Sequence, residues 1–185
     1  DGLILSNLAL RARGDFRVVI NALLCQDREL AQHFYPIDFA GTKAAEKRNS
    51  RAKKLAGKAL EAGIPLVLFP SGMVSTADKR GFGLVCDAPW TTFVAKLARR
   101  HNPLIVPIYF GGQNSRAFHV ASHIAEPLRM AMLMHEALRR FNSTVEVVVG
   151  TPIAPETYGA IEGRQALTHF LYQRVQQLAE PRASL

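Results

Sequence analysis

Two uninterrupted apolar runs constrain the fold of this chain more than any other feature of its sequence. Residues 65–69 read PLVLF and residues 104–110 read LIVPIYF, without a charged residue in either run. Such runs are typical of strands buried on both faces, as in a parallel sheet covered by helices. Residues 17–22 (RVVINA) and 145–149 (VEVVV), which are rich in Val and Ile, are predicted to form two further strands.

Helical patterns lie between these strands, and their ends carry the expected signals. Thr42 is a predicted N-cap and Gly63 a predicted stop for the clearest helix. The predicted helices cover residues 2–11, 43–62, 91–101, 127–141 and 161–179. This alternation predicts an α/β fold with a mostly parallel central sheet and helices on both faces.

The segments between these elements contain weaker signals. Residues 23–40 are ambiguous, with a short helix expected near 26–33 and a short strand near 35–37. Residues 70–89 are expected to form a loop. No repeat or linker interrupts the chain, so one domain is predicted over residues 1–185. Because residue 1 is Asp and opens a helical pattern, this domain is expected to lack its N-terminal part.

The net charge of the chain limits the classes of partner that it is expected to bind. Its 23 Lys and Arg against 15 Asp and Glu give a net charge of +8, concentrated in the helix predicted over 43–62. Such a surface favours nucleic acid, anionic membranes or phosphorylated ligands. No nucleic-acid-binding signature accompanies it, and no aromatic residues are interleaved with its charges, so nucleic acid is not an expected partner. No apolar stretch reaches about 20 residues, so no membrane-spanning helix is predicted.

Three groups of residues have side chains suited to chemistry. Cys25 and Cys86 have no metal-site spacing and are interpreted as buried or idle thiols in a reducing compartment. His119 and His123 lack the Glu of a metalloprotease helix, so they are interpreted as structural or surface residues, and no metal site is expected. The helix predicted over 127–141 is apolar around most of its circumference, which favours burial and leaves contact with lipid as the alternative.

The turn after residues 65–69 is the strongest candidate site. Phe69-Pro70-Ser71-Gly72 follows a predicted buried strand, at the sheet edge where ligands of α/β proteins bind. Backbone amides of such a turn can hold an anion, although a plain connecting turn has the same sequence features. Ser71 is not flanked by the glycines of a nucleophile elbow, so a nucleophilic role is the weaker interpretation.

The order of four motifs resembles the glycerolipid acyltransferase family, typified by 1-acylglycerol-3-phosphate acyltransferases, and within it a bacterial hemolysin-like or lyso-ornithine-lipid acyltransferase branch. Asp1-Gly2-Leu3-Ile4 resembles the end of its His-x-x-x-x-Asp motif, and Tyr35-Pro36-Ile37-Asp38-Phe39 its second motif. Phe69-Pro70-Ser71-Gly72 resembles its Phe-Pro-Glu-Gly block, and Val106-Pro107-Ile108 its fourth motif. Segments 87–90 and 112–116 are similar to the hemolysin-like branch.

The resemblance implies roles for particular residues. Asp1 would orient a catalytic histidine five residues upstream, which would act as general base. The Phe-Pro-Ser-Gly turn would bind the acceptor, and Pro107 would help to shape the acyl site. Phe39 stands where the family has an Arg for the acceptor's phosphate. The nearby Lys43, Lys47 and Arg48 are the candidates to supply that charge.

Two departures from the family pattern concern the acceptor. Ser71 replaces the family's Glu, and Val74 stands where an Arg is common, which argues against a phosphatidate-type acceptor and favours a lyso-aminolipid. The expected reaction moves an acyl group from acyl-carrier protein or coenzyme A to a lysolipid hydroxyl, and it needs no cofactor. The protein is expected in the cytoplasm, peripherally on an anionic membrane surface.

Two other functions remain open at this stage. The basic helix would also suit a non-catalytic module that binds lipid or nucleic acid, with binding that weakens as salt is added. A serine hydrolase using Ser71 would need a histidine and an acid beside that residue.

Overall fold

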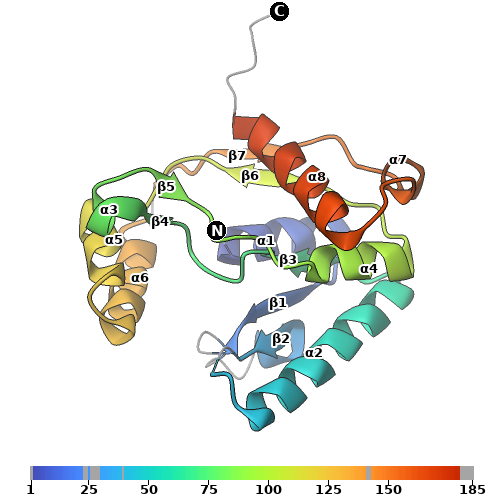
Figure 1. Ribbon diagram of the computed structural model, residues 1–185, viewed down its shortest axis with the longest axis horizontal. Helices are drawn as coiled ribbons and strands as arrows, with labels where there is room; N and C mark the ends of the chain where they lie inside the picture. Colours follow the sequence, from blue (N-terminus) through green and yellow to red (C-terminus); the bar gives the residue numbers. More distant parts are fainter. Residues whose placement is uncertain (1, 23–24, 26–29, 39, 141–142, 180–185) are drawn as a thin grey trace, which may run out of the picture. The chain divides into compact units, whose positions relative to one another are not determined.

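The computed structural model describes residues 2–22, 25, 30–38, 40–140 and 143–179 of the 185-residue chain (Figure 1). The chain divides into two compact units. Unit 1 comprises Asp1–Gly72, Thr91–Ile105 and Ala154–Thr168, and unit 2 comprises Met73–Trp90, Val106–Ile153 and His169–Leu185. The prediction of one domain over residues 1–185 stays a prediction, and each unit is described by itself.

The sheet of unit 1 has three parallel strands, as the sequence predicted. Strand β1 (Arg17–Asn21) lies in the middle, between β2 (Phe34–Ile37) and β3 (Leu66–Leu68) (Figure 1). In this register Val18 is opposite Phe34 on one side and Val67 on the other. The 3-10 helix η2 (Leu30–His33) precedes β2 within the stretch that the sequence left ambiguous.

Helices cover both faces of this sheet. Helix α1 (Gly2–Arg13) packs Leu5 and Ala9 on a core cluster that contains Phe16, Val18 and Val67. Val19 points to the opposite face because side chains alternate along a strand, and it is buried as well. Helix α2 (Lys43–Glu61) contacts all three strands. The predicted α/β class and parallel sheet are therefore confirmed.

Small residues allow α2 to pack closely. Ala52, Ala56 and Gly57 are buried on the inner face of this helix. A methyl group placed on Gly57 would lie 2.9 Å from Nε2 of His101, the last residue of helix α4 (Phe93–His101). The ends of α2 are those predicted, since the Thr42 hydroxyl accepts a hydrogen bond from the Ala45 N–H at 3.1 Å and Gly63 has φ +71°.

Two more helices contribute to unit 1. The short helix α7 (Pro155–Gly159) was not predicted, and its buried Tyr158 donates a hydrogen bond to the carbonyl of Pro103 at 2.7 Å. Helix α8 (Arg164–Gln176) begins in unit 1 and continues into unit 2, where η3 (Gln177–Ala179) follows it. Together α8 and η3 cover residues 164–179 of the helix predicted over 161–179.

Unit 2 contains two antiparallel pairs, which corrects two predictions. Strands β4 (Thr76–Ala77) and β5 (Val85–Cys86) pair across helix α3 (Asp78–Gly81), within residues predicted to be a loop. Strands β6 (Ile108–Phe110) and β7 (Val147–Val149) also pair antiparallel, and not within the parallel sheet. An apolar run indicates burial but names neither the neighbouring strand nor its direction.

Helices α5 (Arg116–Ser122) and α6 (Glu126–Arg139) pack against each other in unit 2. Burial of α6, the favoured interpretation of its apolar sequence, is wrong for much of its surface. Leu128, Met134 and Leu138 are 41%, 63% and 61% exposed, and Glu136 is the one buried residue among those whose burial is described in this helix. Phe141, the last residue of the predicted apolar stripe, lies outside the described residues.

Candidate active site

The Phe-Pro-Ser-Gly turn after β3 is a hydrogen-bonded β-turn. The N–H of Gly72 donates to the carbonyl of Phe69 at 2.9 Å. Pro70 occupies the second position, where its fixed φ is favourable, and Gly72 at the fourth has φ +67°, which glycine adopts without strain. The turn follows the last residue of β3 by one position, as the sequence predicted.

A segment distant in sequence fixes this turn. Both the N–H and the hydroxyl of Thr91 donate to the carbonyl of Pro70, at 2.9 Å and 3.1 Å. Two donors on one carbonyl hold its orientation and satisfy both of its lone pairs. Thr91 was not among the predicted site residues, because a partner 21 positions away leaves no local sequence signal.

The start of α1 lies beside the turn. A methyl group placed on Gly2 would be 4.0 Å from the ring carbon Cε2 of Phe69. Leu5 and Ala9, one and two turns further along α1, belong to the same apolar cluster as the Phe69 ring. Asp1 itself lies outside the described residues. The structure therefore brings the residue next to Asp1 to the Phe-Pro-Ser-Gly turn, which joins two of the four motifs in unit 1.

The proposed phosphate-binding cations of α2 lie in different surroundings. Arg48 forms an ion pair with Asp38 Oδ2, whereas Lys43 is exposed at the first residue of the helix. A hydrogen bond from the Ala40 N–H, together with Arg48, holds the pKa of the Asp38 carboxyl below its usual value. Asn49 also brackets the Asp38 backbone, accepting from its N–H at 2.7 Å and donating to its carbonyl at 2.8 Å.

Pro107, the predicted acyl-site residue, is buried in unit 2 just before β6. Its carbonyl accepts a hydrogen bond from the Gly150 N–H at 2.9 Å. A methyl group on Gly150 would lie 2.9 Å from the ring carbon Cγ of Pro107 and 3.0 Å from Leu178. The ring of Pro107 is therefore held in a tightly packed corner of that unit.

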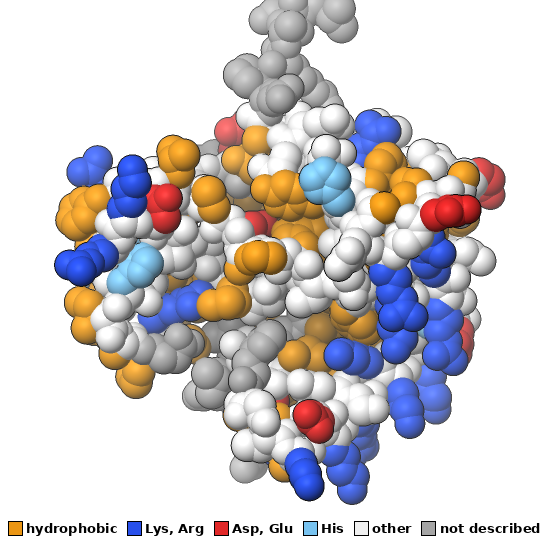
Figure 2. Space-filling view, in the orientation of Figure 1, with side chains coloured by type: hydrophobic (Ala, Val, Ile, Leu, Met, Phe, Trp, Pro, Cys, Tyr) orange, Lys and Arg blue, Asp and Glu red, His pale blue; other side chains and the backbone are white. Residues whose placement is uncertain are grey.

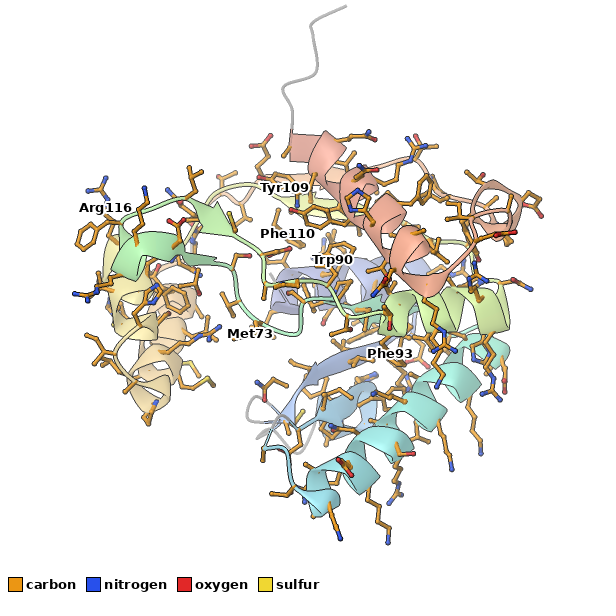
Figure 3. All side chains as sticks on the ribbon, in the orientation of Figure 1. Met73, Trp90, Phe93, Tyr109, Phe110 and Arg116 are labelled. Carbon is orange, nitrogen blue, oxygen red and sulfur yellow. The ribbon has the colours of Figure 1, made fainter. Side chains whose placement is uncertain are left out.

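Asp87 organises the loop that leads to Thr91, a role that the sequence analysis did not assign. The Ser75 hydroxyl donates to one carboxylate oxygen, and the indole N–H of Trp90 donates to the other at 3.1 Å. The Trp90 ring, which is labelled in Figure 3, also packs edge-on against Tyr172, with 5.3 Å between the ring centroids. The Asp-x-x-Trp spacing in segment 87–90 was the available signal, since a side chain can bond its neighbour three residues later.

The two histidines of the HVASH segment are structural, as predicted. Nδ1 of buried His119 accepts a hydrogen bond from the Ala77 N–H at 3.2 Å. Nε2 of His123 donates a hydrogen bond to the carbonyl of Ala77 at 2.7 Å. Cys25 and Cys86 are free thiols, and burial raises the pKa of the Cys25 thiol. Among the described residues, no group of three His, Cys, Asp or Glu side chains is arranged to hold a metal ion.

A family model described as acyltransferase matches residues 1–149 of the chain. The chain belongs to the acyltransferase family. This match spans the start of α1, the Phe-Pro-Ser-Gly turn and the Pro107 segment, and it confirms the resemblance to an acyltransferase family. The roles of the individual motifs stay predictions. No solved structure matches the chain.

Two curated relatives of this acyltransferase are both named lyso-glycine lipid O-acyltransferase. The one from Phocaeicola vulgatus is 29% identical over 170 residues, which cover 85% of this chain and 56% of the relative. The one from Bacteroides thetaiotaomicron is 27% identical over 152 residues, which cover 78% of this chain and 53% of the relative. The chain thus spans a little more than half the length of these relatives.

Proposed function

We propose that this acyltransferase transfers a fatty acyl group from a thioester to the hydroxyl of a lysolipid. The observation that carries the proposal is the proximity of Gly2 to Phe69, since a methyl group placed on Gly2 would lie 4.0 Å from the Phe69 ring. It sets the residue after Asp1 beside the Phe-Pro-Ser-Gly turn, in a chain that belongs to the acyltransferase family. The names of the two curated relatives support a lysolipid as the acceptor.

The proposed reaction uses Asp1 together with a histidine five residues upstream. The histidine takes the proton of the acceptor hydroxyl while the oxygen attacks the thioester carbonyl, and Asp1 orients the ring and stabilises its charged form. When the tetrahedral intermediate collapses, the carbon–sulfur bond breaks and the thiol leaves with the proton from the histidine. The product is an ester, and this chemistry requires a positioned base and a polarised carbonyl.

A zwitterionic or amino-acid headgroup suits the turn better than a glycerol phosphate. Ser71 and Val74 take the places where the family has a Glu and commonly an Arg, and Arg48 is paired with Asp38. Recognition of a phosphomonoester would require cations that can reach it. We therefore propose a lyso-aminolipid acceptor, with lyso-glycine lipid as the first to test, and acyl-carrier protein or coenzyme A as the carrier of the acyl group.

We further propose that the protein works peripherally at an anionic membrane of the cytoplasm. Within the described part of the chain, no helix is both long enough and apolar enough to cross a bilayer. Helix α6 instead exposes Leu128, Met134 and Leu138, and Arg139 lies next to Leu138. Apolar side chains that enter the interface beside cations that attract anionic lipid are what a peripheral helix requires.

The decisive experiment uses the full-length protein and a radiolabelled acyl thioester. Transfer of label to lyso-glycine lipid is expected for the wild type, with acyl-carrier protein and coenzyme A donors compared in parallel. Asp1→Asn should lower the rate by at least about 100-fold, since the general base loses its orienting partner. Asp15→Asn, which removes a carboxylate of unit 1 two residues after the end of α1, is the matched control and should keep most of the activity.

Three results would contradict the proposal. Release of free fatty acid without acylated lipid would indicate a hydrolase. Full activity of Asp1→Asn would remove Asp1 from the mechanism. A residue other than histidine five positions before Asp1 in the complete reading frame would exclude the His–Asp pair.

A further inference from the structure

Four cationic side chains line a hollow on unit 1, away from the Phe-Pro-Ser-Gly turn in sequence. Its volume is about 430 Å³, within the range of sites that bind small molecules. Lys96, Arg99 and Arg100 come from α4, and Gly163 and Arg164 come from the start of α8. Each of the four cations is exposed. Figure 2 shows that blue side chains gather over α2 and α4 on this side of the molecule.

In the described part of the chain, no carboxylate pairs with the cations of this hollow. Among the described residues, none of the four cations forms an ion pair within 4.0 Å, and Glu61, which approaches the end of α4, pairs with His101 at 3.3 Å. Glu162 precedes Gly163 in sequence but does not line the hollow. Four like charges facing one space repel each other, so an anion placed there would relieve this repulsion.

The start of α8 adds to the positive potential. The first helical hydrogen bond runs from the Leu167 N–H to the Gly163 carbonyl at 3.2 Å, so the amides of residues 164–166 precede it. Helix α8 has no acidic residue in its first turn and begins on Arg164, which is unfavourable for the helix dipole. Arg99 and Arg100, by contrast, lie in the last turn of α4, where cations are favourable. The position of Arg164 at the start of α8 is therefore not explained by an electrostatic contribution to the stability of the helix.

The walls of the hollow are fixed by contacts within unit 1. The guanidinium of Arg99 donates to the carbonyl of Ile161, which ties α4 to the segment before α8. Tyr158 ties α7 to the residues after α4 through its hydrogen bond to Pro103. Gly163 has φ +79°, and a methyl group there would meet nothing within 4 Å, so the space beside this residue is open.

We propose that this hollow binds a phosphate-bearing ligand with two or more negative charges. Guanidinium groups hold phosphate oxygens through paired hydrogen bonds, Lys96 contributes a point charge, and helix amides complete the oxygen contacts. The hollow is larger than a single phosphate, so it has room for a diphosphate or for a phosphate with part of its attached group. This site does not depend on the proposed acyl transfer.

The ligand chemistry has two sources, a soluble phosphate compound or a phospholipid headgroup, and the experiment separates them. Inorganic pyrophosphate is titrated into the full-length protein by calorimetry at low salt. Vesicles of phosphatidylcholine with and without phosphatidate are tested by co-sedimentation. The hollow variant is Arg100→Gln with Arg164→Gln. The matched control is Arg51→Gln with Lys54→Gln, which removes two exposed charges from α2, and thermal melts check that both proteins fold.

The hollow variant should weaken binding at least about tenfold and the control less than about threefold, because specific contacts outweigh a general loss of charge. Hollow-dependent binding of pyrophosphate supports a soluble phosphate ligand. Hollow-dependent binding of phosphatidate vesicles without pyrophosphate binding supports a headgroup. Equal weakening by the two variants, or no binding of either probe, would overturn the proposal, because attraction would then be non-specific or absent.

Discussion

The carboxylate of Glu136 accepts two hydrogen bonds from Ser115, the N-cap residue of helix α5. One oxygen accepts a hydrogen bond from the Ser115 hydroxyl at 2.6 Å, and the other accepts from the Ser115 N–H at 3.1 Å. The same hydroxyl is the N-cap of α5, where it accepts from the Phe118 N–H at 3.2 Å. A buried acid on α6 thus fixes both the cap of a neighbouring helix and the packing of the two helices.

Replacing Glu136 with Gln should destabilise the protein by about 1.5–3 kcal/mol. Both hydrogen bonds from Ser115 would lose their charged acceptor, and the NH₂ group of Gln would face one of the two Ser115 donors. Urea unfolding followed by circular dichroism measures the loss. Glu156→Gln, at an exposed residue in the first turn of α7, is the control and should change the free energy of unfolding by no more than about 0.5 kcal/mol. Equal losses in the two variants would remove the special role of Glu136.

The acid dependence of stability follows from the same carboxylate. Burial raises the pKa of Glu136, but the hydrogen bonds from Ser115 and the nearby Arg139 outweigh it and hold the pKa below the usual 4.5. The stabilisation is therefore complete above the unfolded pKa and is lost as the pH falls through the lower folded pKa. The difference in unfolding free energy between wild type and Glu136→Gln should stay constant above pH 4.5 and shrink at lower pH. Urea midpoints at a series of pH values test this, and a difference that grows toward acid would contradict it.

Local rules predicted the parts of the fold that local forces decide. Thr42 and Gly63 bound α2 as expected, because capping and positive φ depend on a few adjacent residues. The strand over residues 145–149 was also predicted, but its antiparallel pairing with Ile108–Phe110 was not. Strands of two residues, such as Thr76–Ala77, are too short to display an alternating pattern at all.

The candidate site was predictable to the same extent. Pro70 and Gly72 predicted the turn, because the backbone preferences of Pro and Gly depend on the residue itself and not on distant contacts. The Thr91 bonds to Pro70 and the Asp38 pairing of Arg48 join residues 10 or more positions apart, and only the folded chain brings them together. The exposed face of α6 was misjudged because composition reports how apolar a helix is and not which side its neighbours cover.

Gly81→Ala should destabilise the protein on the order of 2–4 kcal/mol. Gly81 has φ +96°, and a methyl group there would lie 2.7 Å from the backbone nitrogen of Val120, which cannot move without shifting α5. Gly159→Ala is the matched control, because a methyl group at Gly159 would meet nothing within 4 Å. Thermal unfolding of both variants measures the contrast, and a Gly81→Ala protein as stable as the control would refute the close approach of α3 and α5.

The His119–Ala77 hydrogen bond gives a test of the corner that precedes α3. His119→Phe keeps a ring of similar size but leaves the Ala77 N–H without its acceptor, which should cost about 1–3 kcal/mol. His135→Phe, at an exposed position of α6, is the control and should change the stability little. Hydrogen exchange of the Ala77 amide should accelerate in His119→Phe beyond the change caused by lower global stability. Unchanged exchange relative to that global change would show that Nδ1 does not hold this amide.

The exposed face of α6 should govern membrane binding. Met134→Gln with Leu138→Gln replaces two side chains that are more than 60% exposed, with residues that keep the helix. Loss of their apolar contact with the bilayer should weaken partition into anionic vesicles by about tenfold or more. Leu55→Gln with Leu104→Gln removes two exposed leucines of unit 1 and is the control. Co-sedimentation with vesicles of rising anionic content measures both, and equal weakening by the two pairs would show that α6 is not the membrane-facing helix.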